Sequence, residues 1–306
     1  MTFVDLHRPL RRFSTRRRRE ALIGYAFILP PLLVFSVFTF YPFLHNFKQA
    51  LYETPPFPNQ PSRYVGLHQA GHVLSSSQFL QSLTSTILFT LIVVPLGLFA
   101  GLLLAVAAHR RLRGIGIYRT IFSSTVVTSV AIAAVIFGTF MDPVVGLLPW
   151  LGINTSPPLL ENPTWALLAV ALVTVWQGLG LSFIIMSAGL QSVPDDVLEA
   201  AEIDGASPAA RFWHVTVPLL SPILFFALVI GTISAFQSFG QIDLLTGANS
   251  AYLHTDVLTY LIYQNIQGQA PNPGTASVLS IALFVMTLML TLIQLRFVER
   301  RVHYAQ

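Results

Sequence analysis

Six apolar segments without a single Asp, Glu, Lys or Arg dominate this sequence of 306 residues. They cover residues 21–43, 83–108, 120–141, 165–190, 217–242 and 275–295. Each is long enough to cross the hydrocarbon core of a bilayer, which takes about 20 helical residues. Only 10% of all residues are charged and 54% are hydrophobic, which a soluble domain of this size rarely shows. The sequence therefore predicts an all-α, multi-pass membrane bundle of six transmembrane helices.

The first apolar run follows a basic tail, residues 1–20, that contains seven arginines. A cleavable signal peptide would have a shorter apolar core, roughly 7 to 15 residues, followed by a small-residue cleavage site. This run instead continues to Phe43. We therefore expect a retained first helix, and we divide the chain into a basic tail at 1–20 and a transmembrane domain at 21–306.

Arginine and lysine are concentrated in alternate connections between the runs. Fifteen of the 17 lie in the N-terminal tail, in residues 110–119, at Arg211 and after residue 295, while only Lys48 and Arg63 lie in the other connections. Basic residues near membrane helices mark the cytoplasmic side. The sequence thus predicts a protein of the cytoplasmic membrane with both termini in the cytoplasm. This placement also explains the basic residues by topology and not by nucleic-acid binding.

The missing charges limit the possible mechanism. Proton-coupled carriers and charge-selective channels place ionisable residues inside the membrane, whereas sodium coupling through backbone carbonyls stays open. The chain has no cysteine and no phosphate-binding GxxxxGK loop, so we expect it to be non-catalytic and driven by a partner. His68 and His72 have a ligand-like spacing but no predicted helix and no third ligand, so we expect a surface loop there and no metal site.

A polar segment, residues 194–222, separates the fourth and fifth runs. An aspartate that follows Pro194 is predicted to cap a first helix. Gly205 is predicted to end it in the left-handed conformation, and Ser207-Pro208 to start a second helix. That helix carries Phe212 before Pro218 opens the fifth run. The pattern predicts a helix-turn-helix at the membrane surface, with an ordinary interfacial connector as the alternative.

This segment resembles the EAA loop of the permeases of binding-protein-dependent ABC importers. The residues that carry the resemblance are Glu199, Ala200, Ala201, Asp204, Gly205, Ala206, Phe212, Pro218 and Pro222. The resemblance implies that the loop contacts an ATP-hydrolysing subunit, and the ATPase-coupling residues expected from it are Glu199, Ala200, Ala201, Asp204, Gly205, Ala206, Arg211, Phe212 and Pro218.

The same resemblance implies an assembly. This chain would be half of a translocation path that works by alternating access, beside a second homologous permease, two ATP-binding subunits and an extracytoplasmic substrate-binding protein. ATP and Mg²⁺ would bind the ATPase subunits, with no cofactor in this chain. A secondary carrier acting alone and a non-transporting assembly subunit are the rival interpretations.

Residues 22–304 are similar to the maltose-type carbohydrate-uptake branch of this family. The run Gln294 to Tyr304 is similar to the end of the first permease subunit of glycerol-3-phosphate and glycerophosphodiester importers, such as those for glycerophosphocholine. The sequence departs from the family pattern at Gly240 and at residues 247–250. A di- or oligosaccharide is the alternative substrate.

Substrates rich in hydroxyl groups pair with amides, hydroxyls and aromatic rings. On that basis the predicted substrate-path residues are Trp176, Gln177, Ser234, Phe236, Gln237 and Gln241. Packing between membrane helices is the alternative role for the same side chains.

Overall fold

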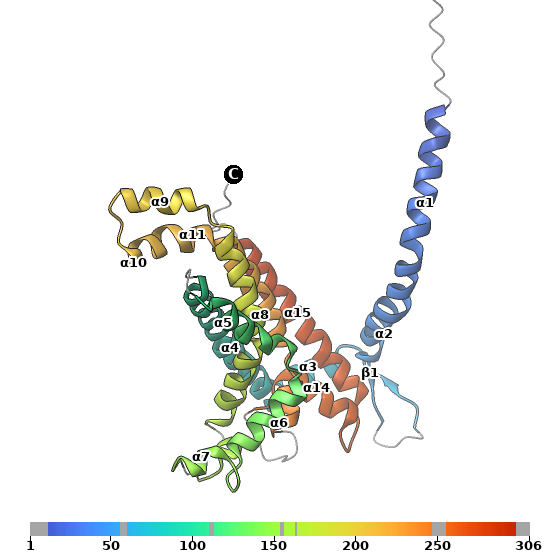
Figure 1. Ribbon diagram of the computed structural model, residues 1–306. Coiled ribbons are helices and arrows are strands. Elements are labelled where there is room, and N and C mark those ends of the chain that lie inside the picture. Colours follow the sequence, from blue (N-terminus) through green and yellow to red (C-terminus); the bar gives the residue numbers. More distant parts are fainter. Residues whose placement is uncertain are drawn as a thin grey trace, which may run out of the picture.

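The computed structural model describes residues 12–55, 60–109, 113–153, 156–162, 164–246 and 255–297. Figure 1 shows a bundle of long helices, from which a first helix splays away and a short helical hairpin projects at one end. The long helices are α1 (Arg12–Phe35), α4 (Ser77–His109), α8 (Ala166–Gln191), α12 (Ser221–Phe236) and α15 (Pro273–Phe297). The all-α, multi-pass fold expected from the sequence is confirmed.

Shorter elements connect them. The chain continues from α1 through a π-helical turn (Ser36–Phe40) into α2 (Tyr41–Gln49). The remaining elements outside the helical hairpin are β1 (Tyr52–Glu53), β2 (Arg63–Tyr64), α3 (His68–Leu74), α5 (Ile115–Ser124), a 3-10 turn (Thr125–Val127), α6 (Val130–Met141), α7 (Leu147–Trp150), a 3-10 turn (Leu159–Glu161), α13 (Gly240–Thr246) and α14 (Leu258–Gln267). The two strands pair antiparallel, with Tyr52 opposite Tyr64.

The core of the bundle forms where α4 and α8 pack along each other with α12 beside them. Phe89 of α4 and Val170 of α8 are fully buried at one level. Met186 and Leu220 are fully buried nearer the helical hairpin. Because burying a side chain of this size contributes about 1.5–3 kcal/mol, this contact fixes the frame on which the other helices sit.

Two of the six predicted spans are broken. Four helical stretches are long and apolar enough to cross a membrane, and the total reaches six only when each of two bent helix pairs is taken as one span. The third predicted span bends by 101° between residues 115–127 and 130–141. The fifth bends by 66° between residues 208–219 and 221–236. The count of six spans therefore includes two interrupted ones, because neither 120–141 nor 217–242 is one continuous helix.

Local chemistry explains the first break. Thr128 is extended, and the side chain of Ser129 accepts a hydrogen bond of 3.3 Å from the backbone N–H of Ile132, which caps the start of α6. A hydroxyl that caps a new helix stabilises an interruption that the apolar composition alone does not reveal. In the fifth run, α12 ends at Phe236 and α13 begins at Gly240.

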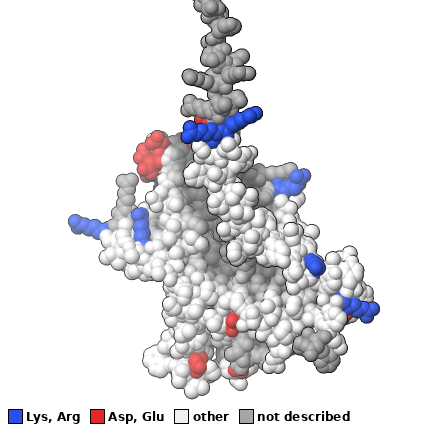
Figure 2. Space-filling model, turned by 90° about the vertical axis from the view of Figure 1, so that its right-hand side faces the viewer, with Lys and Arg blue, Asp and Glu red and all other residues white. Residues whose placement is uncertain are grey.

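The first span makes little contact with the rest of the chain. None of the most apolar window of residues 17–49 is buried, and Phe27 and Phe38 are more than 70% exposed. Figure 2 shows that most of the visible surface carries neither Lys or Arg nor Asp or Glu. Such a surface suits lipid or another apolar protein surface.

Hydrogen bonds join the two ends of the chain. Thr54 Oγ1 accepts from the backbone N–H of Gly274 at 3.0 Å, and Ser277 Oγ donates to Gln49 Oε1 at 3.3 Å. Further along, Thr86 Oγ1 accepts from the backbone N–H of Leu258 at 2.9 Å. The start of α15 is thus held against the segment that follows α2.

Other sequence expectations fall on the connections. His68 and His72, expected in a loop, lie one turn apart on α3; in the part of the chain described, no group of three His, Cys, Asp or Glu side chains could hold a metal ion. Residues 247–250 and 298–304, which figured in the resemblance, lie outside the described residues, as do Arg110 and Arg111.

Candidate functional site

Two features of the bundle carry most of the predicted site residues: a helical hairpin at one end and a polar pocket in the middle. The helical hairpin, residues 195–219, consists of α9 (Asp195–Ile203), α10 (Pro208–Arg211), a π-helical turn (Phe212–Thr216) and α11 (Val217–Leu219). Its two arms lie side by side and project from the bundle (Figure 1). We call this end of the bundle the hairpin end.

The turn of the hairpin forms as its sequence predicts. Gly205 has a φ of +80°, which a glycine adopts without the strain that a Cβ would bring. Ser207 then accepts a hydrogen bond of 3.2 Å from the backbone N–H of Ala210 and caps the second arm. The start differs, because Pro194 occupies the cap position and Asp195 lies inside the first turn. Its carboxylate still lies at the positive end of the helix dipole.

An ion pair links the two arms. The guanidinium of Arg211 donates to the carboxylate of Glu202 across the turn. Beyond it the hairpin exposes apolar side chains, since Ile203 is 86% exposed and Trp213 is 62% exposed and packs edge to face on Phe212. Large exposed apolar side chains on a charged hairpin mark a surface suited to another protein.

The predicted coupling residues are all on this hairpin. Glu199, Ala200, Asp204 and Gly205 are exposed, whereas the following residues are half-buried: Ala201, Ala206, Arg211, Phe212 and Pro218. Pro218 was expected to open the fifth span. It lies instead before the bend at Leu220, and α12 starts at Ser221.

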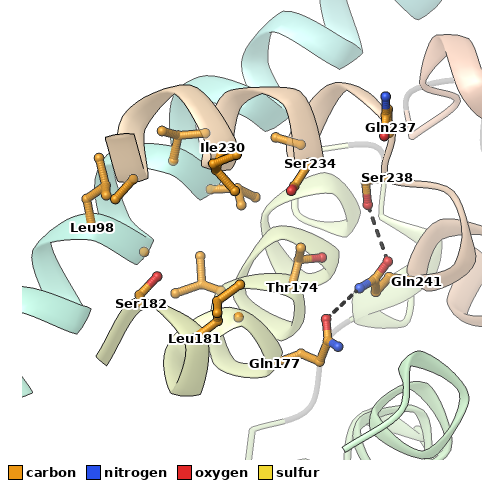
Figure 3. Close-up of a pocket in the computed structure, with 18 of the residues that line it drawn as sticks. Leu98, Thr174, Gln177, Leu181, Ser182, Ile230, Ser234, Gln237, Ser238 and Gln241 are labelled. Carbon is orange, nitrogen blue, oxygen red and sulfur yellow. Dashed lines mark hydrogen bonds between the residues drawn. The ribbon is translucent and has the colours of Figure 1, made fainter. Parts of the chain in front are cut away.

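The pocket has a volume of about 460 Å³ and lies between α4, α8, α12 and α13. None of the described residues that line it is Asp, Glu, Lys or Arg. Figure 3 shows polar side chains from α8 and from the α12–α13 region pointing toward one another across it. The polar lining residues are Thr174, Gln177, Ser182, Ser234, Gln237, Ser238 and Gln241. This uncharged lining offers hydroxyl and amide groups among aliphatic side chains.

Four of the six predicted path residues line this pocket, and two do not. Trp176 packs edge to face on Phe137 with ring centroids 5.0 Å apart, and Phe236 is buried in the bundle. Neither ring is among the lining residues. Both aromatic residues therefore lie away from the pocket, because their large apolar rings are used in helix packing.

Sequence reasoning missed three hydroxyl residues of the pocket: Thr174, Ser182 and Ser238. Thr174 lies three residues before Gln177 and eight residues before Ser182, and both spacings place side chains on the same side of a helix. That spacing was the available signal. Ser238 lies two residues after the end of α12, and its position depends on the break between α12 and α13.

A chain of hydrogen bonds, which we call the glutamine relay, connects this pocket to the break in the third span. Gln177 Nε2 donates to the backbone oxygen of Thr128 at 3.3 Å. Gln241 Nε2 donates to Gln177 Oε1 at 3.1 Å, and Ser238 Oγ donates to Gln241 Oε1 at 3.3 Å. The backbone oxygen of Ser238 accepts from Thr259 of α14. The relay therefore joins four separate segments at one edge of the pocket.

Two carboxyl groups outside the spans, at the end opposite the hairpin, have shifted pKa values. Burial raises the pKa of Asp256 to about 6. The pKa of Asp142 is lowered because its carboxylate accepts hydrogen bonds from the backbone N–H groups of Val145 and Val144, at 2.9 and 2.8 Å. Neither group is among the residues that line the pocket.

Comparison with known proteins places these features in a wider context. The family described as "Binding-protein-dependent transport system inner membrane component" matches residues 64–304. The sn-glycerol-3-phosphate transport system permease protein UgpA of Agrobacterium fabrum is 35% identical over 291 residues, which cover 92% of this chain and 97% of the relative. UgpA of Rhizobium meliloti is 33% identical over 288 residues, with the same coverage.

Solved structures share the fold. A chain of a bacterial ABC transporter involved in the import of the acidic polysaccharide alginate superposes with a TM-score of 0.81 at 24% identity, over 94% of this chain and 99% of that one. A second alginate transporter structure, in complex with an alginate pentasaccharide-bound periplasmic protein, gives a TM-score of 0.80 at 23% identity, over 95% of this chain and 99% of that one.

Proposed function

The chain belongs to the family of binding-protein-dependent transport system inner membrane components and is a permease subunit of an ABC importer, and on this premise we propose that its substrate is glycerol 3-phosphate or a glycerophosphodiester. The observation that carries the proposal is the identity of 35% to a glycerol-3-phosphate permease over 92% of the chain. The match covers nearly the whole relative, so it includes the segments that form the pocket.

An oligosaccharide is the second candidate, and the pocket is the reason. In the described part of the chain its lining has no lysine or arginine for a phosphate group, whereas hydroxyls and amides such as Ser234 and Gln237 pair well with sugar hydroxyls. A phosphate group on this path would have to be met by helix N-termini or by the second permease. The glycerol part of the substrate would suit the hydroxyl and amide lining in either case.

The helical hairpin is proposed as the energy input. The exposed side chains of Ile203 and Trp213 would contact an ATP-hydrolysing partner. The ion pair of Glu202 and Arg211 would hold the two arms together, so that they move as one rigid unit. ATP and Mg²⁺ would bind two such partners, while a second permease completes the path and a binding protein delivers substrate. Closure of the ATPase subunits would then drive alternating access through the hairpin. The catalytic step would lie in the partners, and this chain would carry none.

The proposed orientation places the hairpin end in the cytoplasm. Arg113 and Arg119 belong to the connection at this end, as does Arg296 at the end of α15. Lys48 and Arg63 lie at the opposite end, which would be extracytoplasmic. Both termini would then be cytoplasmic.

The substrate proposal is tested with the assembled importer in proteoliposomes that contain ATP. Uptake of labelled glycerol 3-phosphate is measured with its binding protein, in competition with glycerophosphocholine and with maltose. We expect the two phosphate compounds to compete and maltose not to compete. Competition by maltose alone would favour the oligosaccharide candidate, and uptake by this chain alone without ATP would disprove the importer mechanism.

The hairpin proposal has its own test. Gly205→Val places a branched side chain on a backbone with a φ of +80°, and we expect substrate-stimulated ATP hydrolysis to be lost while the complex still assembles. Gly71→Val, on α3 at the other end, is the matched control, because a Cβ there meets no atom within 4 Å. Unchanged stimulation in Gly205→Val would contradict the proposed role.

A further inference from the structure

A second pocket, of about 420 Å³, lies at the end opposite the hairpin, where α2, the β1 strand and the start of α15 meet. It shares no residue with the first pocket. Its lining is of a different kind, because among the described residues it contains two basic side chains, several hydroxyl and amide groups, two prolines and no acidic side chain. The lining side chains used below are His45, Lys48, Gln49, Tyr52, Thr54 and Ser62.

Two polar side chains of this pocket, Thr54 and Gln49, use their oxygens as acceptors within the protein and keep their hydrogens as donors. Thr54 Oγ1 accepts the backbone N–H of Gly274 at 3.0 Å, so the hydroxyl hydrogen of Thr54 remains to be donated. Gln49 Oε1 accepts from Ser277 Oγ at 3.3 Å, so the NH₂ group of Gln49 is still able to donate hydrogen bonds. A hydroxyl has one hydrogen and an amide NH₂ has two. Both acceptors are therefore used in the scaffold, and the donors are available to a ligand.

Two basic side chains stand beside these donors. His45 and Lys48 are three residues apart on α2, which places them on one face of the helix. Lys48 is exposed, and among the described residues it forms no ion pair. The nearest acid in sequence, Glu53, alternates with the lining residues Tyr52 and Thr54 and so points to the other face of the strand, opposite Arg63.

The position of Lys48 indicates that it binds something at this end of the protein and does not help to set the membrane topology. In the proposed orientation, Lys48 and Arg63 are the two lysines or arginines of the outer connections, where positive charge works against the topology of the chain. The pocket also receives the N-terminal end of α15, a helix of 25 residues, whose dipole is positive at that end. Charge, donors and helix end therefore all favour an anion with several acceptor oxygens.

We propose that this second pocket binds a phosphate ester group, with Lys48 as its principal charged ligand and Gln49 and Thr54 as hydrogen-bond donors. A phosphate ester supplies several acceptor oxygens, and charge-assisted hydrogen bonds to them are stronger than neutral ones. Two sources fit this chemistry. One is a soluble glycerol phosphate from outside the cell, and the other is a phospholipid head group, since the apolar surface of α2 beside the pocket is exposed. This site is separate from the proposed transport path, and binding to it is measured without measuring transport.

The test uses the full-length protein in its native assembly, placed in nanodiscs without the binding protein. In the first arm, phosphatidylcholine nanodiscs are titrated with glycerol 3-phosphate and with inorganic phosphate, and binding is measured by phosphorus NMR. In the second arm, the nanodiscs contain phosphatidylglycerol, and native mass spectrometry counts the phosphatidylglycerol molecules that remain bound. The variants are Lys48→Gln and Lys48→Arg, with Arg63→Gln as the matched control for outer charge.

We expect Lys48→Gln to weaken binding about tenfold or more in one arm, because a hydrogen bond to a charged group contributes roughly 1.5–3 kcal/mol. Lys48→Arg should keep most of the binding, and Arg63→Gln should change it less than about twofold, since Arg63 faces away from the pocket. The arm that responds identifies the source. The proposal is overturned by no binding to the wild type in either arm, by equal binding to Lys48→Gln, or by an equal loss in Arg63→Gln.

Discussion

Gln241 Nε2 donates a hydrogen bond of 3.1 Å to Gln177 Oε1, across 64 residues of sequence. Gln177 in turn satisfies the backbone oxygen of Thr128, which the break in the third span leaves without a helical partner. The amide of Gln177 therefore has a structural task as well as a place in the pocket lining. A substitution at Gln177 therefore changes both roles together, and a lining residue without these hydrogen bonds is needed for comparison.

Alanine at Gln177 is expected to reduce both transport and stability. Its removal leaves Thr128 and Gln241 each short of one hydrogen bond, at a cost of about 1–3 kcal/mol if the groups stay buried. Gln237 lines the same pocket but is exposed, so Gln237→Ala should reduce uptake without lowering the melting temperature. Unchanged uptake of every candidate substrate in both variants, at normal expression, would show that these two residues do not belong to the substrate path.

A methyl group at Gly180 should destabilise the bundle. A Cβ at this position would overlap Thr125 Oγ1 and would lie 2.7 Å from the backbone nitrogen of Val126, so Gly180→Ala should cost about 1–3 kcal/mol through overpacking. Gly178 on the same helix has no atom within 4 Å of such a Cβ. Gly178→Ala should therefore be neutral or stabilising in thermal melts, and equal destabilisation by both would show that the turn does not rest against α8.

Charge reversal tests the pair of Glu202 and Arg211. Glu202→Arg and Arg211→Glu should each lower the coupling of substrate to ATP hydrolysis, because like charges then face each other across the turn. The double variant restores an opposite pair and should recover part of the coupling. Since Glu202 is 70% exposed, the pair itself should contribute only about 0.2–1 kcal/mol in a double-mutant cycle. No recovery in the double variant would indicate that each residue acts separately.

The stability of the protein should depend on pH through Asp256. Its folded-state pKa of about 6 lies above its ordinary value of 3.8, so the folded state binds the proton more tightly. The resulting stabilisation is fully present below pH 3.8 and is lost as the pH rises through 6. Melting temperatures between pH 4.5 and 7.5 should fall in the wild type more steeply than in Asp256→Asn.

Asp142→Asn is the control for that measurement. The pKa of Asp142 is lowered, so this group is ionised in the folded and unfolded states throughout the same pH range and adds no slope there. The asparagine oxygen can still accept from Val144 and Val145. Parallel melting curves for wild type and Asp256→Asn would contradict the assigned pKa shift.

The sequence predicted elements that depend on local chemistry. Gly205 and Ser207 define the hairpin turn because a left-handed backbone and a helix cap each need one suitable residue. The apolar runs were likewise predicted, because lipid imposes one requirement on every residue in them. These signals act over a few neighbouring residues and are visible without any tertiary structure.

Features that depend on distant partners were predicted less well. The break at Thr128 depends on Gln177 of another helix, although the cluster of hydroxyl residues from Ser123 to Ser129 was a signal for it. Trp176 was expected in the pocket because of its chemistry, yet the ring packs on Phe137. Which face of a buried helix meets a cavity is set by packing between helices, and helices that are apolar on all sides carry no pattern that reveals it.

The contact between Thr54 and Gly274 also has a consequence for the timing of synthesis. These residues are 220 positions apart, and at about 5–20 residues per second a ribosome needs roughly 10 to 45 s to make the second after the first. During that interval the β1–β2 hairpin lacks the helix end against which it finally rests. The hairpin can therefore make its final contact with α15 only after nearly the whole chain has been synthesised.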